Sequence, residues 1–262
     1  VRPMRETDLE GGLRLAEAAG WNQRLADWRL VHSLSGGAAF VAAEGERIAA
    51  TTAAVRYANR VAWVAMVLVD PAYRRRGLAT RLMQATLESL AACDTVKLDA
   101  TPAGREVYLK LGFEDESGLT RFQIAAAPAS VPAAVPGPRI RPLTGRDLPA
   151  VAALDAEAFG CDRSELLARL LEMAPDYARV AEGAEGIEGF GMGRHGLRWE
   201  YLGPLAARTE TAARALAAAT LSAMAGRPAL ADAPDERGPF QAWLRERGFA
   251  EQRAFIRMRK GP

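Results

Sequence analysis

The sequence has few of the residues on which several classes of function depend. Among its 262 residues there are two histidines and two cysteines, Cys93 and Cys161. The cysteines have neither metal-ligand nor redox spacing, so we interpret both as small buried hydrophobes and predict no metal site. The formal net charge is only +2. So small an excess of positive charge argues against nucleic acid as a partner.

Long apolar runs are also missing. No stretch approaches the roughly 18 apolar residues of a membrane span, and the first residues lack the cationic and apolar regions of a signal peptide. We therefore expect no membrane partner and a cytoplasmic location. Lysine is scarce while arginine and alanine are abundant, which indicates a high-GC bacterial genome. A chain of this length holds one large or two ordinary domains.

One stretch organises the chain. Val61–Val69 is an apolar run rich in β-branched residues, which predicts a strand covered on both faces. Pro71 ends it, because proline has no N–H for a sheet ladder. Apolar residues at helical spacing then predict a helix from Thr80 to about Ala92. The short apolar run at residues 95–98 completes a right-handed parallel crossover of strand, helix and strand.

The turn between this strand and helix has the features of an anion site. The first N–H groups of a helix have no partner within the helix. Gly77 removes the Cβ where the backbone must approach a ligand, and Ala79 is the smallest residue that keeps helix propensity. Three arginines at residues 74–76 add positive charge. The anion that this turn favours is a pyrophosphate.

Arg74-x-x-Gly77-x-Ala79 after a strand ending Val-Asp-Pro-x-Tyr resembles the acyl-CoA signature of the GNAT superfamily of N-acyltransferases. The segment from Thr101 to Phe113, with its Tyr108-x-x-x-Gly-Phe, resembles the second signature of that family about 30 residues further on. The resemblance implies an α/β (α+β) fold and acetyl-CoA as co-substrate. It also implies these contacts for the co-substrate: Val67, Leu68, Val69, Arg74, Arg75, Arg76, Gly77, Leu78, Ala79, Thr80 and Thr101.

The resemblance also assigns a role to Tyr108, which protonates the departing CoA thiolate in the family. Two positions depart from the family pattern, because Ala79 replaces a frequent glycine and Thr101 a frequent asparagine. Each feature has a structural alternative as well. An arginine cluster by itself is usually a solvated face, and a tyrosine before Gly-Phe can be a core residue.

The N-terminal segment is expected to wall the acceptor site. Val1–Met4 reads as a strand, a helix should run from residue 8 to about residue 19, and Leu25–Leu34 should form a second helix. Residues 38–44 and 48–55 alternate as a hairpin. In the GNAT arrangement the helices border the acceptor, which makes Trp21, Asn22, Asp27 and Trp28 candidates for substrate contact. The alternative is that both tryptophans only cover the core.

The groups that move protons are less clear from the sequence. A β-bulge near Met66 or Val67 would leave a strand amide free to bind the acyl oxygen. The central strand contains no carboxylate, so Asp99 and Asp27 are the nearest candidates for a base. His32 is a further candidate, although a lone helical histidine is more often structural. We predict that the proton leaves the amine through a water relay.

The second half repeats the first after a linker. Residues 125–138 hold four prolines and no charge, which is typical of an extended, semi-rigid linker. Ile140-Arg141-Pro142-Leu143 then repeats Val1-Arg2-Pro3-Met4 at an offset of 139, and Gly248-Phe249 repeats Gly112-Phe113 at 136. We expect a GNAT catalytic domain at 1–126, a linker at 127–138 and a degenerate GNAT-like domain at 139–262.

The second copy has lost the reactive residues. Aligning Ala219-Thr220-Leu221 with Ala85-Thr86-Leu87 places Thr211 at the position of Gly77 and Glu210 at that of Arg76. A Cβ and a carboxylate there oppose pyrophosphate binding. Leu244 stands at the position of Tyr108. The glycine run at 189–193 lacks the G-x-G-x-x-G spacing of a dinucleotide motif.

Together these features predict an acetyl-CoA-dependent N-acetyltransferase that acts by direct attack of a primary amine in a ternary complex. The second domain then shapes the acceptor site or mediates homodimerisation. The alternative is a non-catalytic acyl-CoA-binding sensor or interaction module. A small aromatic amine, an amino acid and a protein N-terminus remain equal candidates for the acceptor.

Overall fold

A computed structural model describes residues 1–262 except residue 59 and residues 131–136. The chain divides into two compact units. Unit 1 contains Val1–Ser117 together with Phe255–Pro262, and unit 2 contains Gly118–Ala254. Within the described residues, no helix is long and apolar enough to cross a membrane.

Unit 1 is a mixed sheet with helices on both faces. Its strands follow the order β1-β2-β3-β4-β5-β12, and all neighbours are antiparallel except β4 and β5. The elements are β1 Arg2–Pro3, the 3-10 turn η1 Glu6–Asp8, α1 Leu9–Ala18, α2 Leu25–Leu34, β2 Ala39–Glu44, β3 Arg47–Tyr57, β4 Val61–Val69, the 3-10 turn η2 Pro71–Tyr73, α3 Leu78–Ser89, β5 Thr95–Ala100, α4 Pro102–Leu109 and the end of β12 (Ala250–Lys260).

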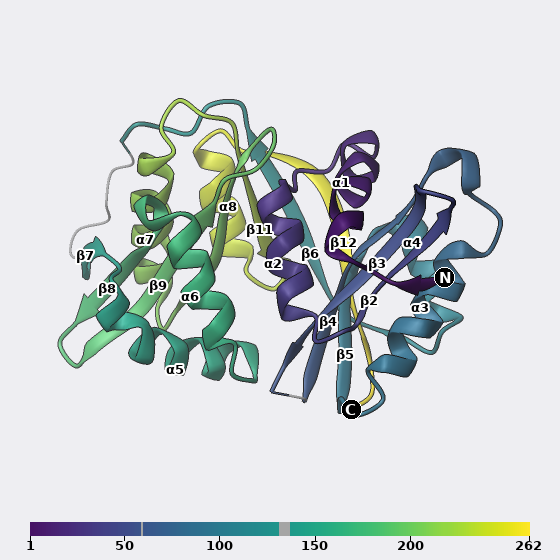
Figure 1. Ribbon diagram of the computed structural model, residues 1–262. Coiled ribbons are helices and arrows are strands. Elements are labelled where there is room, and N and C mark those ends of the chain that lie inside the picture. The colour runs from purple at the N-terminus through teal and green to yellow at the C-terminus, as the bar shows by residue number, and fades with distance from the viewer. Residues whose placement is uncertain (59, 131–136) are drawn as a thin grey trace. The chain divides into compact units, whose positions relative to one another are not determined.

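Helices α1 and α2 cover one face of this sheet, and α3 and α4 cover the other (Figure 1). Ala62 and Val64 of β4 pack with residues of α3, whereas Met66 and Leu68 pack with residues of α1 and α2. The change of face occurs because the register shifts by one residue at Met66, whose φ is +55°. Side chains of the single strand β4 therefore pack against both helical layers.

The sequence-based elements of unit 1 are confirmed. The predicted bounds of α2 and β4 match those in the structure, and the expected parallel crossover joins β4 to β5 through α3. The prediction that β4 is covered on both faces is wrong in one respect. Burial alternates along β4 between buried and half-buried residues, so that Trp63 and Ala65 before the bulge, and Val67 and Val69 after it, are only partly covered.

Unit 2 repeats this architecture with the strand order β6-β11-β10-β9-β8-β7. Its elements are β6 Glu114–Ile124, β7 Arg139–Pro142, the 3-10 turn η3 Gly145–Asp147, α5 Leu148–Phe159, α6 Ser164–Met173, the 3-10 turn η4 Pro175–Tyr177, β8 Arg179–Gly183, β9 Gly186–Arg194, β10 Glu200–Ala207, α7 Glu210–Ala223, β11 Ala229–Pro234, α8 Gly238–Glu246 and the start of β12.

The duplication extends to individual hydrogen bonds. Arg2 donates two hydrogen bonds to Asp8, at 2.6 and 2.9 Å, and Arg141 donates two to Asp147, at 2.9 and 2.8 Å. Each aspartate also accepts from a backbone amide three residues earlier, at 2.7 and 2.8 Å. The same pair thus fastens the first strand of each unit to the first helical turn.

The compact units do not follow the predicted domain boundaries at their last strands. Ile256–Lys260 of β12 pairs with Val96–Ala100 of β5 inside unit 1. Leu119–Ile124 of β6 pairs with Ala229–Pro234 of β11 inside unit 2. The last strand of each sequence repeat therefore belongs to the unit formed by the other repeat, which a linear division at 126 and 139 does not represent. Part of the predicted linker, 131–136, lies outside the described residues.

Candidate functional site

The site in unit 1 begins with the loop that joins β4 to α3. Asp70 accepts hydrogen bonds from the amide of Ala72, at 2.9 Å, and from the Arg47 guanidinium, at 2.8 Å. Arg75 and Gly77 both lie in the left-handed region, with φ of +61° and +72°. Two such residues close together turn the chain sharply into α3. A side chain at Gly77 would find no described atom within 4 Å, so the backbone angle and not crowding favours glycine there.

The amino end of α3 lacks a side-chain cap. Gly77 is the N-cap residue and has no side chain to offer, and the first backbone hydrogen bond of the helix runs from Arg81 to the carbonyl of Gly77. The amides of residues 78–80 therefore point outward, beside exposed Arg74 and Arg75. Arg76 packs over the Tyr73 ring at 4.9 Å. Free amides, a helix dipole and two cations form a site that suits an anion.

The two central strands separate beside this loop. The parallel pairing of β4 and β5 extends only from Val61 and Thr95 to Trp63 and Lys97. Beyond that point β4 contains the bulge at Met66 and Val67, and the carbonyl of Met66 accepts from the Thr51 hydroxyl at 2.8 Å. The predicted bulge is therefore present. Unpaired edges of two parallel strands leave room for an extended ligand between them.

Tyr108 lies on α4, which follows β5 directly. Thr101 caps that helix through its hydroxyl, which accepts from the amide of Gly104 at 3.2 Å. The Tyr108 ring packs edge-on against Phe113, with 6.0 Å between centroids. Burial raises the pKa of Tyr108 to about 12. The hydroxyl is therefore protonated throughout the neutral range and can act only as a proton donor there.

Asp99 is placed on the opposite face of β5 from the core residues Leu98 and Ala100. Its carboxylate accepts from Arg257 Nε at 2.9 Å and from Arg257 Nη2 at 3.4 Å. The sequence prediction named Asp99 but missed Arg257, which is 158 residues away along the chain. Arg257 could have been found from the sequence repeat, because the offset of 136 that relates the Gly-Phe pairs also relates Arg121 to Arg257.

The predicted acceptor residues of the first two helices are more buried than an acceptor site requires. Trp28 is 1% exposed and Asn22 is 5% exposed. The Asp27 carboxylate accepts from the amide of Arg24 at 2.7 Å, as a capping residue does. Trp21 is half-buried against the same apolar cluster, and His32 lies 3.2 Å from the carbonyl of Met4. Trp28, Asn22 and Asp27 are buried, whereas Trp21 and His32 each keep some exposed surface.

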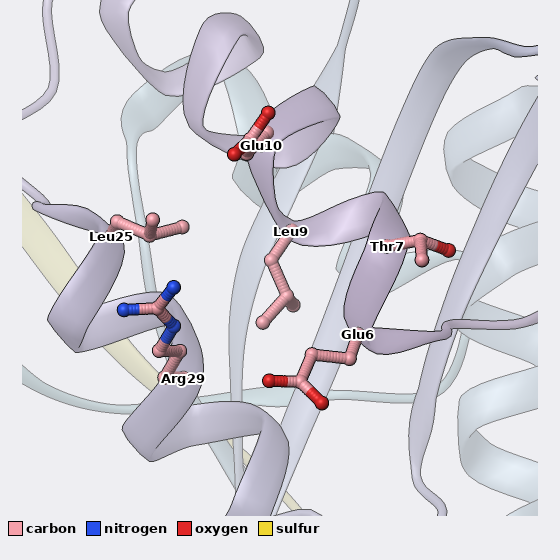
Figure 2. Close-up of a pocket in the computed structure, with 6 residues that line it drawn as sticks. All are labelled: Glu6, Thr7, Leu9, Glu10, Leu25 and Arg29. Carbon is pink, nitrogen blue, oxygen red and sulfur yellow. The ribbon is translucent and has the colours of Figure 1, made fainter.

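A hollow of about 250 Å³ opens between η1, α1 and α2. Figure 2 shows Leu9 and Leu25 pointing into it, with Glu6 and Arg29 on its two sides. Glu10 and Thr7 complete the lining. Leu9 belongs to the same apolar cluster as Met66 of the bulge. None of these lining residues was predicted as a site residue, although Glu6 and Glu10 are a carboxylate pair one helical turn apart in the sequence.

Unit 2 has no counterpart of the anion loop. Only residues 208 and 209 separate β10 from α7, where residues 70–77 separate β4 from α3. Thr209 is the N-cap of α7, and its hydroxyl accepts from the amide of Ala212 at 3.1 Å. In the predicted alignment Thr211 stands at the position of Gly77, and it lies inside α7 because that helix begins two residues earlier than α3 does. One amide of the first turn of α7, that of Ala212, thus has a side-chain cap, which α3 lacks.

Unit 2 also differs at the bulge and at the end of the following helix. The register of β10 shifts between Leu202 and Leu205, so Pro204 occupies the second bulge position, where unit 1 has Val67. Proline has no N–H to offer a ligand. The carbonyl of Leu244 accepts from the amide of Phe249 at 3.1 Å, as that of Tyr108 does from Phe113. Leu244 thus replaces the tyrosine with an apolar side chain.

Comparison with known families gives two matches along the chain. The description "Acetyltransferase (GNAT) domain" applies to both, at residues 35–115 and at residues 151–262. An uncharacterized N-acetyltransferase of Bacillus subtilis (strain 168), YitH, is 24% identical over 192 residues, which are 73% of this chain and 67% of that protein. The second match extends over Phe255–Pro262, the segment that completes unit 1.

Solved structures with the same fold were also found. A putative acetyltransferase from Pyrococcus horikoshii has a TM-score of 0.82 at 22% identity and covers 100% of this chain and 88% of its own. A tandem GNAT protein from the clavulanic acid biosynthesis pathway has a TM-score of 0.67 at 14% identity, with coverage of 99% and 98%. At these identities the likeness concerns the fold, including its duplication.

Proposed function

Because the chain carries two GNAT acetyltransferase domains in tandem and is an N-acetyltransferase, we propose that unit 1 moves an acetyl group from acetyl-CoA to a primary amine. The amine attacks directly in a ternary complex, and unit 2 binds no acetyl-CoA. The observation that carries the proposal is the uncapped amino end of α3, which follows a loop with two left-handed residues. Its counterpart in unit 2 is capped by Thr209.

The residues of unit 1 fit acetyl-CoA at three places. The amides of residues 78–80, with Arg74 and Arg75, would hold the pyrophosphate. The unpaired edges of β4 and β5 would accept the extended arm, and the bulge at Met66 and Val67 would bind the acyl oxygen. Acetyl-CoA supplies an acetyl group that is activated as a thioester. The loop holds the anion without blocking the bulge.

The amine has to lose a proton before it can attack. A lysine-like amine has a pKa of about 10.4, so freeing its lone pair at pH 7 costs about 4.6 kcal/mol, which is 3.4 units at 1.36 kcal/mol each. We propose that water carries this proton away, because each of the two carboxylates that the sequence offers as a base already accepts a hydrogen bond within unit 1. Asp99 accepts from Arg257, and Asp27 accepts from Arg24.

Tyr108 would supply the other proton. A thiol like that of cysteine has a pKa of about 8.5, well below the value of about 12 to which burial raises the pKa of Tyr108. The phenol therefore remains protonated until a thiolate develops beside it. Its O–H donates a hydrogen bond that stabilises the developing thiolate, and full transfer of the proton to the sulfur, which is uphill by about 3.5 pKa units, is drawn forward by departure of the thiol.

Release of free thiol from acetyl-CoA tests this proposal. The intact chain is mixed with acetyl-CoA and in turn with tyramine, L-lysine and trialanine, which represent the three acceptor classes. We expect one class to accelerate thiol release well above the rate without amine. An acyl-CoA-binding sensor would instead bind acetyl-CoA, as measured by calorimetry, and release no thiol with any of them.

A further inference from the structure

The last strand of the chain brings a cation to the reaction site proposed for unit 1. Arg257 on β12 is the cross-strand partner of Asp99 on β5. Its guanidinium lies 2.9 Å from one oxygen of Asp99 and 3.4 Å from the other. The same guanidinium lies over the ring of Trp63 on β4, at 4.8 Å from the centroid. Arg257 thus contacts residues of both β4 and β5, and we call the unpaired stretch of these strands beyond Trp63 and Lys97, which is the proposed ligand position, the cleft.

Asp99 lies where that separation begins. The last parallel pair of β4 and β5 is Trp63 with Lys97, and Asp99 is two residues further along the same face. This face lies opposite the layer formed by α3 and α4, to which Leu98 and Ala100 point. Trp63 and Asp99 therefore border the cleft on the side away from α3.

The carboxylate of Asp99 can still bind a ligand. It has room for about four hydrogen bonds, and Arg257 occupies two of them. The side chain of Asp99 is 27% exposed and that of Arg257 is 31% exposed. The neighbouring charges on this face, Lys97 and Glu116, pair with each other at 2.6 Å. The remaining lone pairs of Asp99 suit an ammonium donor.

We propose that Arg257 is a positioning residue for the acceptor in unit 1, an inference that rests on the proposed function. It holds the Asp99 carboxylate and the Trp63 indole at the mouth of the cleft. Asp99 then accepts a hydrogen bond from the protonated amine and aligns it with the bulge before its proton leaves. The acceptor class is a primary amine that carries its positive charge at the reacting nitrogen.

Unit 2 holds the same arrangement, but a further hydrogen bond within the unit occupies its carboxylate. Arg121 on β6 donates two hydrogen bonds of 2.6 Å to Asp232 on β11, and it lies 5.9 Å from the Tyr201 centroid on β10. Here the Tyr201 hydroxyl also donates to Asp232, at 2.9 Å. In unit 1 the corresponding residue is Trp63, which has no phenolic hydroxyl to offer Asp99. Arg121 is therefore the matched control for Arg257.

The test compares Arg257→Gln, Arg257→Lys and Arg121→Gln with the unchanged chain. Thiol release is measured with saturating acetyl-CoA against the most active of tyramine, L-lysine and trialanine. We expect Arg257→Gln to raise the KM for the amine about tenfold or more, from the loss of charge-assisted positioning. Arg257→Lys should recover part of this loss, Arg121→Gln should stay within about twofold of wild type, and acetyl-CoA affinity should hold in all three.

The outcomes separate this inference from the proposed function. An equal effect of Arg257→Gln and Arg121→Gln on the amine KM would mean that both arginines only hold the sheet together, which overturns the inference. If Arg257→Gln does not fold, as judged by circular dichroism, an amine KM for Arg257→Lys equal to wild type overturns it as well. If the unchanged chain binds acetyl-CoA but releases no thiol with any amine, the proposed function fails first.

Discussion

The two units share a scaffold and differ at three points on it. Both fasten their first strand with an Arg–Asp pair, both cross from one parallel strand to the next through a helix, and both place a register shift in the first of these strands. Unit 1 adds a loop at residues 70–77, an N–H at Val67 and the phenol of Tyr108. Unit 2 has residues 208 and 209, Pro204 and Leu244 instead.

This difference teaches which residues serve the fold and which the reaction. The shared pairs and apolar clusters keep both sheets folded, so they are needed whether or not chemistry occurs. The loop, the Val67 amide and the Tyr108 phenol are not needed for packing, because a shorter turn, a proline and a leucine take their places in unit 2. The first amides of α3 have no side-chain cap among the described residues, so that a ligand or water can satisfy them.

We expect the largest effect from deleting the strand that completes unit 1, which belongs to the second sequence repeat. Deletion of Phe255–Pro262 takes β12 away from β5, together with Met258, which is fully buried in the core of unit 1. We expect unit 1 to lose its cooperative melting transition and acetyl-CoA to show no binding heat. A chain that lacks only Gly261 and Pro262 keeps the paired strand and should still bind. Binding by the longer deletion would contradict this account of the units.

Tyr108→Phe should affect turnover next most strongly. Loss of a positioned general acid lowers kcat by about 100-fold to 10,000-fold, while acetyl-CoA affinity stays the same because the ring still packs on Phe113. The control is Tyr177→Phe in unit 2, whose pKa burial also raises to about 12. We expect the kcat of this control, measured by steady-state thiol release, to stay near the wild-type value. Similar kcat values for the two variants would contradict the proposed role of Tyr108 as the general acid.

The pH dependence of kcat is a second test of Tyr108 as the general acid. Because burial raises the pKa of Tyr108 to about 12, its proton is present throughout the neutral and mildly alkaline range. We expect no decline of kcat between about pH 8 and pH 10. Initial rates at saturating concentrations of both substrates measure this. A decline centred near pH 9 would indicate that a different acid protonates the thiolate.

The smallest expected effects are on stability and should be equal in the two units. The guanidiniums of Arg2 and Arg141 hold the pKa of Asp8 and of Asp147 below the usual carboxyl value. A lowered pKa in the folded state stabilises the protein above about pH 4, and that contribution is lost as the pH falls further. Asp8→Asn and Asp147→Asn should each cost about 1–2 kcal/mol at pH 7.

Denaturant titration at two pH values checks this equality. The difference between each variant and wild type should shrink on going from pH 7 to about pH 3, because protonation removes the ionised partner from the wild type as well. A large loss at Asp8 beside none at Asp147 would mean that the shared hydrogen bonds do not serve both units alike.

Local patterns predicted most of unit 1, because strand and helix periodicity depends on neighbours in the sequence. The apolar run at Val61–Val69 and the helix at Leu25–Leu34 follow from such patterns, whereas the bulge near Met66 was expected from the proposed mechanism. The burial of Trp28 was left open, since a tryptophan beside a helix start fits both a core and a binding site. The structure places it in the core.

Features that depend on distant partners were missed. The exchange of last strands cannot be derived from periodicity, because β6 and β12 have the same pattern whichever β-strand they join. The contact of Arg257 with Asp99 follows from that exchange and was missed with it. The shortened turn before Glu210 was also missed, because a gapless alignment along the helix shows no change of length ahead of it.

Calorimetric titration of acetyl-CoA tests the difference between the units most directly, with the unchanged chain, Gly77→Glu and Thr209→Glu. We predict one site per chain, which Gly77→Glu abolishes by placing a carboxylate beside the free amides of α3, and which Thr209→Glu leaves intact. Gly77→Asn, which tolerates the left-handed backbone, should keep measurable binding. Two sites per chain, or a single site that is lost in Thr209→Glu and kept in Gly77→Glu, would contradict the assignment of acetyl-CoA binding to unit 1 alone.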